Sequence, residues 1–154
     1  MTFHDESGNV IDYGNRWDGS PPEDAYSRTS NLERYAPLHT VAEALIAHLC
    51  AEYQAEVVET TSPEGERTVE LVPANSDGAP IKLRFTDFPG IEVFVGESGW
   101  MRPSCGCDAC DETWEESADD MERFVLGAVE DGHTAIGGLS APRIWRPWLR
   151  PADG

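Results

Sequence analysis

Two segments with helical periodicity enclose a run of segments with strand periodicity, and this order limits the folds open to the chain. Residues 37–52 begin with a proline suited to a first helical turn, and Thr40 and Glu43 have capping-box spacing. Residues 112–131 form a second amphipathic segment that Gly132 is suited to end. The two apolar stripes comprise Leu38, Val41, Ala42, Leu45, Ile46 and Leu49, then Trp114, Ala118, Met121, Val125 and Ala128.

Four strand-like segments lie between these helices, at residues 53–60, 67–73, 80–86 and 91–95. The turn residues 62–65 separate the first two segments and indicate a hairpin. Sequential strands with short links favour an antiparallel meander. A loop over residues 97–110 then leads into the second helix. The predicted fold class is therefore α+β, a four-stranded antiparallel meander flanked by two amphipathic helices, with an extended N-terminal arm.

The length of 154 residues predicts a single domain, residues 1–154. Residues 1–35 are turn-rich yet hold Tyr13, Trp17, Tyr26 and Tyr35, so we expect an arm that lies across the body of the fold. Residues 36–137 form the predicted body. Residues 138–154 form an Arg/Trp-rich tail, which is expected either to pack on the chain's own acidic helix, to bind a partner, or to exchange between two copies.

The formal net charge is −18, from 29 acidic and 11 basic residues. Such a charge repels phosphate backbones and anionic lipids, so neither a nucleic acid nor a membrane is an expected partner. Solubility explains the charge, and an unknown protein partner with a basic surface is the alternative; the chain is expected to be a monomer or a homodimer. No secretion signal and no apolar run of about 20 residues are found, which predicts a cytoplasmic protein.

Three cysteines lie within six residues, at Cys105, Cys107 and Cys110. Clustered thiols in a reducing compartment bind metal more often than they form disulfides. Zinc prefers four soft ligands in a tetrahedron, and Gly106 would relieve the backbone between ligands two residues apart. The following helix start favours thiolates through its dipole. The pattern predicts a zinc site, with reduced thiols in a tight loop or a redox pair as the alternatives.

A fourth zinc ligand must come from elsewhere in the chain. His133 lies beyond a helix of about 30 Å and would be at its wrong end. An even number of antiparallel strands returns the chain to the sheet end where it started, which would bring Cys50, and secondarily His48, to the cluster. The alternative for Cys50 is a small buried hydrophobic residue.

No phosphate-binding glycine loop, nucleophile elbow or zinc-protease motif is present, so no catalytic residue and no organic cofactor site is predicted. Four protein ligands would make a structural zinc, whereas three ligands and a water would make an open site that needs an acid or base. Asp108, Asp111 and Glu112 are near, but acids at a helix start are usually caps. We therefore expect a non-catalytic domain with a structural zinc and a protein-interaction role, with a thiol-redox or metal-dependent enzyme as the alternative.

Several short segments resemble an uncharacterised family of small bacterial proteins from GC-rich genomes, classed as a domain of unknown function. They are residues 13–17, 25–28, 34–39 and 88–90, together with the cysteine segment 105–112, which is the most specific. The resemblance covers roughly residues 13–131. It implies a one-domain cytoplasmic protein and carries no activity, substrate or cofactor.

Overall fold

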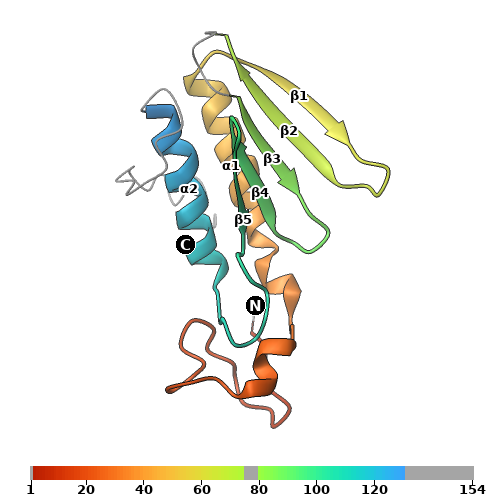
Figure 1. Cartoon of the computed structure of the whole chain (residues 1–154), viewed down its shortest axis with the longest axis vertical. Coiled ribbons are helices and arrows are strands. Elements are labelled where there is room, and N and C mark those ends of the chain that lie inside the picture. The colour runs from red at the N-terminus through yellow and green to blue at the C-terminus, as the bar shows by residue number, and fades with distance from the viewer. Residues whose placement is uncertain (1, 75–79, 131–154) are drawn as a thin grey trace.

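The computed structural model describes residues 2–74 and 80–130, and Figure 1 shows how the elements are arranged. An N-terminal arm carries two short 3-10 helices, η1 (Glu23–Ser27) and η2 (Leu32–Tyr35), and leads into helix α1 (Pro37–Glu52). Helix α2 (Trp114–Glu130) follows the sheet. The strands are β1 (Ala55–Thr61), β2 (Arg67–Pro73), β3 (Ile81–Phe85), β4 (Ile91–Val95) and β5 (Ser98–Arg102). The predicted Arg/Trp-rich tail, 138–154, lies outside the described residues.

The sheet is a purely antiparallel meander in the order β1-β2-β3-β4-β5, which confirms the α+β class and corrects the predicted strand number from four to five. The additional strand, β5, lies in the segment predicted as loop. Gly96 and Glu97 form a two-residue hairpin turn, and Gly96 has the positive φ of 58° that such a turn requires at its first position. Gly99 obscured the strand pattern, and the ring of Phe94 occupies the space that a side chain there would need.

Both helices cover one face of the sheet. The register aligns Leu71 with Ile81 and Ile81 with Val95, so side chains of one parity form a continuous apolar face. These side chains form one core with the predicted stripe of α1 and with Ala118, Met121 and Val125 of the predicted α2 stripe, against which Trp114 packs. The buried strand residues are Val69, Leu71, Ile81, Leu83, Phe85, Ile91, Val93 and Val95.

The two helices differ in how their first turns are capped. Helix α1 has the predicted bounds, but the expected capping box is wrong: Ala36 is the N-cap and no side chain caps the helix. Instead, Glu43 pairs with Arg67 of β2. The capping box occurs at α2, where Thr113 Oγ1 accepts a hydrogen bond from Glu116 N at 3.2 Å and Thr113 N donates to Glu116 Oε2 at 3.4 Å.

Helices α1 and α2 run in the same direction and begin at the same end of the molecule, beside the N-terminal arm (Figure 1). The Tyr35 hydroxyl, just before α1, donates to the backbone oxygen of Glu112, just before α2, at 2.9 Å. Five strands, an odd number, carry the chain from the far end of α1 back to this end. Within the described part of the chain, no helix combines the length and hydrophobicity that a membrane crossing requires.

Candidate metal centre

Three thiols converge in the loop between β5 and α2. The sulfur atoms of Cys105, Cys107 and Cys110 all lie within 4.8 Å of one another, and those of Cys107 and Cys110 are 3.3 Å apart. A tetrahedral zinc with Zn–S bonds of about 2.3 Å separates its sulfurs by about 3.8 Å, which lies between these two distances. All four cysteines are free thiols. The three clustered thiols are therefore close enough to bind one metal ion.

The three thiols differ in their exposure to solvent. Cys107 is buried, Cys105 is half-buried and Cys110 is exposed. Burial acts to raise the pKa of Cys107, but hydrogen bonds from Cys110, Cys105 and the Ala109 backbone outweigh it and lower this pKa. Hydrogen bonds with Cys107 and Cys105, together with burial, raise the pKa of Cys110 to about 12. The buried Cys107 is thus the thiol that ionises first of this hydrogen-bonded pair.

The cysteine loop is docked onto the N-terminal arm through backbone hydrogen bonds. Asp108 N donates to Arg28 O at 2.8 Å, and Ala109 N donates to Ala25 O at 3.2 Å. The indole Nε1 of Trp17 donates to Asp108 O at 2.9 Å. Ala25, Cys107 and Ala109 also form a small buried cluster, against which Trp17 and Cys105 pack. This second apolar cluster joins the arm to the loop.

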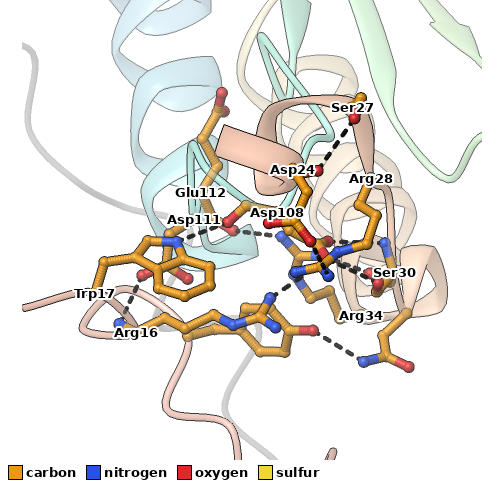
Figure 2. A network of polar contacts seen from close by, with 12 residues as sticks. Arg16, Trp17, Asp24, Ser27, Arg28, Ser30, Arg34, Asp108, Asp111 and Glu112 are labelled. Atoms are coloured by element: carbon orange, nitrogen blue, oxygen red, sulfur yellow. Dashed lines mark hydrogen bonds and ion pairs between the residues drawn. The ribbon is translucent and has the colours of Figure 1, made fainter. Parts of the chain in front are cut away.

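The Asp108 carboxylate is the polar centre of this junction (Figure 2). Its side chain is 1% exposed. It accepts hydrogen bonds from Ser30 N at 2.9 Å, Ser30 Oγ at 2.8 Å and Arg28 Nε at 3.3 Å. The guanidinium of Arg16 lies 3.6 Å away. Two arginines and a serine from the arm therefore compensate one buried charge on the cysteine loop.

The acids at the start of α2 also serve as acceptors. The Glu112 carboxylate accepts from Ser104 N at 2.9 Å, Ser104 Oγ at 2.7 Å and Cys105 N at 2.8 Å. Asp111, in the left-handed region at φ 51°, accepts from Arg16 N at 2.9 Å. These contacts hold the loop's shape. Asp111 and Glu112 do not show the expected capping contacts with α2, because Thr113 caps this helix instead.

Arg34 and Tyr35 extend the junction into the start of both helices, and the sequence analysis missed their role. The Arg34 guanidinium stacks on the rings of Tyr13 and Tyr35, at 4.0 and 4.3 Å from their centroids. It donates to Tyr35 Oη at 2.6 Å, to Ser30 O at 2.9 Å and to Glu112 O at 3.3 Å. The sequence signal that could have indicated this role is the adjacent pair of a basic and an aromatic residue directly before α1.

Gly106 is required for space and not for an unusual backbone angle. It is not among the positive-φ glycines of the described chain. A Cβ atom at this position would lie 2.7 Å from Cε2 of the Phe88 ring, and also close to Leu32. Phe88 comes from the turn between β3 and β4 and lies 6.0 Å from the Tyr35 ring, in a stacked orientation. The turn thus presses against the loop between two thiols.

The structure does not bring Cys50 to the cluster. Cys50 is exposed in the last turn of α1, about 20 Å along the helix from the end that faces the thiols, and His48 lies in the same terminal region. The expectation that Cys50 lies near the cluster relied on an even number of strands. Because β5 makes the number odd, α2 begins at the end of the sheet opposite to the end of α1. His39, in the first turn of α1, lies 3.0 Å from Gly90 O through Nε2, a hydrogen-bond contact with the turn between β3 and β4 and not with the thiols. His133 lies outside the described residues.

A comparison with protein-family models matches residues 1–148 to the "Family of unknown function (DUF6226)". The chain belongs to this family. Membership in DUF6226 confirms the resemblance to a family of unknown function that its cysteine segment and arm motifs had indicated. No curated protein and no solved structure matched the chain. The family therefore adds no reaction or ligand to what the geometry of this DUF6226 chain shows.

Proposed function

We propose that Cys105, Cys107 and Cys110 bind one zinc ion that has a structural, non-catalytic role: it stabilises the junction between the N-terminal arm and the body. The observation that carries the proposal is the convergence of three sulfur atoms within 4.8 Å in a loop that also docks the arm. Cross-linking three loop residues through one ion would shape the surface that the arm covers. Thiolates are the soft ligands that zinc prefers.

The electrostatics of the junction support a bound cation with thiolate ligands. Three thiolates and one Zn²⁺ leave a net charge of −1 on the loop, in addition to the buried Asp108. The guanidinium groups of Arg16 and Arg28 contact Asp108 and bring positive charge to the same junction. The negative charge of the loop therefore lies beside two arginines of the arm, which offset it. Such positive charge is scarce in a chain whose formal net charge is −18.

Three protein ligands leave one tetrahedral position. Among residues 2–74 and 80–130, no His, Asp or Glu joins the three sulfurs in a potential metal-binding group. We assign that position to a solvent molecule on the exposed side, where Cys110 lies. The coordination is then open, and the structural role that we propose rests on the loop's contacts with the arm and not on a closed set of four protein ligands. The neighbouring carboxylates of Asp108 and Glu112 accept several hydrogen bonds each, which favours a structural role over acid–base catalysis.

Native mass spectrometry and thiol labelling of the full chain test this proposal. We expect one zinc per chain, and three thiols that react with a labelling reagent only after chelation. Cys107→Ser should lose the metal and lower the melting temperature by at least about 5 °C, because metal binding and folding are coupled. Cys50→Ser is the matched control and should keep both. Metal-free protein whose melting temperature is unchanged by Cys107→Ser would refute a structural zinc.

A thiol–disulfide exchange function is the second candidate, and the Cys107–Cys110 pair favours it. The two sulfurs are 3.3 Å apart, and the pair combines a lowered pKa with a raised one. In such a reaction one thiolate of the pair would attack a partner disulfide, which forms a mixed disulfide and releases one partner thiolate. The second cysteine would then displace the other partner sulfur, which leaves a Cys107–Cys110 disulfide and the partner as a dithiol. Metal-free protein that forms a reversible Cys107–Cys110 disulfide would favour this function over the zinc site.

The interaction role rests on surface charge. A formal net charge of −18 disfavours a phosphate backbone or an anionic membrane and favours a protein partner with a basic surface. We propose that the domain acts by binding such a partner while the metal keeps the arm in place. Loss of binding on raising the salt concentration is the expected signature in a pull-down from cell extract.

A further inference from the structure

Strand β1 is an edge of the sheet without the bulge, proline or lysine that commonly limits further pairing. Its seven residues pair with β2 in an uninterrupted register from Ala55 to Thr61, so the strand holds no bulge. Six of the seven residues are exposed, and the strand contains no proline and no lysine. Val57 and Val58 are 47% and 40% exposed. Natural edges are commonly protected by one of those features or by other charged side chains, and Glu56 and Glu59 are the charges that β1 carries.

The opposite edge, β5, is different. It contains Gly99, and Pro103 follows it directly. Helix α2 packs beside β5, and the Trp100 ring contacts Phe124 of α2 edge-on, at 5.2 Å between centroids. Arg102 stacks over the same Trp100 ring and pairs with Asp120. Among the residues that the structure describes, α2 thus lies beside β5, whereas no further element lies beside β1 (Figure 1).

We propose that β1 pairs antiparallel with β1 of a second copy of this chain, about a two-fold axis at Val58, to form a ten-stranded sheet across a homodimer. In an edge strand only every second residue directs its backbone N–H and C=O groups away from the sheet. Two copies of the same strand can therefore pair about a two-fold axis only if the axis lies at a residue and not between two residues. Because Val58 is the middle of a seven-residue strand, only the axis at Val58 pairs all seven residues.

The side chains of β1 are self-complementary in this register. Val58 meets Val58 of the second copy, and Glu56 meets Thr60. On the other face Glu59 meets Val57, and no glutamate is opposite a glutamate, which is the arrangement that cross-strand pairing disfavours. Glu59 is also paired with Arg67 of its own chain, which offsets its charge. The exposed valines are covered, and a closed two-fold pairing removes the free edge.

This dimer should be weak and should tighten with salt. A single strand pair buries less than the roughly 1,200 Å² of a standard stable interface, and two chains of formal charge −18 repel each other. Screening reduces the repulsion, so added salt should favour association. That direction is opposite to the salt dependence expected for a basic partner.

Sedimentation velocity of the full chain tests the proposal at concentrations up to about 100 μM, where an interface of this size is measurable. We expect a species of twice the 16.9 kDa chain mass that grows with protein and salt concentration. Val58→Lys and Val58→Glu should each be monomeric, because like charges meet at the axis, and mixing the two should restore a dimer. Val10→Lys, at an exposed position of the arm, is the control and should leave the dimer unchanged.

Thr60→Lys tests the proposed strand register in a way that an effect on folding cannot imitate. It places a cation opposite Glu56 of the second copy, twice by symmetry, and should tighten the dimer about threefold or more. Impaired folding cannot produce such a gain. A wild-type chain that stays monomeric at high salt, or a dimer that Val58→Lys leaves intact, would overturn the proposal. The zinc site takes no part in this test, so either proposal can fail without the other.

Discussion

Asp108 shows how one residue can join two distant parts of a chain. Its carboxylate lies between the arm and the cysteine loop and is 1% exposed. An isolated carboxylate would be costly to bury, and here Ser30, Arg16 and Arg28 compensate it. In sequence Asp108 looks like an ordinary loop acid, since its partners lie 78 or more positions earlier. Its role therefore follows from the docking of the arm.

Asp108→Asn should destabilise the protein by about 2–4 kcal/mol, because the two arginines lose the charge that they contact at a buried site. Chemical denaturation measures the loss, and faster proteolysis between residues 13 and 31 would report release of the arm. Asp24→Asn is the matched control: Asp24 also pairs with Arg28, but its side chain is 68% exposed, so its loss should cost less than about 1 kcal/mol. Equal effects of the two substitutions would show that burial of Asp108 contributes nothing.

At the scale of elements, the cysteine loop is shaped by segments that are far away in the chain. The β3–β4 turn presents the Phe88 ring to Gly106, the arm supplies the acceptors of the loop's backbone amides, and Glu112 binds back to Ser104 and Cys105. The positions of the three sulfurs thus depend on packing that surrounds the loop. A short peptide with the same cysteine spacing would lack these supports.

Gly106→Ala should weaken metal binding and destabilise the fold by about 1–3 kcal/mol, because the added methyl group overlaps the Phe88 ring. Metal content by mass spectrometry and thermal unfolding are the measurements. Adding Phe88→Leu should return part of the metal binding, since the smaller side chain makes room. A variant with full metal content and unchanged stability would show that the loop adapts freely and that the ring does not position it.

At the scale of the whole molecule, an odd strand number places both helix starts, the arm and the cysteine loop at one end. Tyr35 is fully buried at this junction and links η2 to the start of α2. Burial raises the pKa of Tyr35 above its ordinary value near 10, and the nearby Arg34 charge acts against this shift. The neutral hydroxyl is therefore part of the folded state.

The stability of the protein should fall as the pH rises above about 10, and be unaffected by Tyr35 below that pH. Above pH 10 the unfolded state loses the Tyr35 proton while the folded state keeps it, so unfolding becomes more favourable with pH. Denaturant titrations between pH 8 and 11 measure this slope. Tyr35→Phe should be destabilised at neutral pH by the loss of the donated hydrogen bond, and its slope above pH 10 should be shallower. Parallel slopes for the two proteins would contradict the assignment.

Local patterns in the sequence were sufficient to predict both helices and four of the five strands. Helix α1 has its predicted bounds, the first four strands lie where alternation placed them, and the three cysteines cluster as their spacing indicated. These features follow from side chains close together in the chain, where periodicity and short spacing act directly.

Only the tertiary structure decided which elements share an end, and with it the surroundings of the candidate site. One unrecognised strand, disguised by Gly99, reversed the end of the sheet at which α2 begins and moved the thiols away from Cys50. The contacts of Asp108 with Arg16 and of Tyr35 with Glu112 likewise join residues about 80–90 positions apart. Such contacts depend on the direction of every intervening strand, so an error in one element changes all of them, whereas periodicity within an element is unaffected.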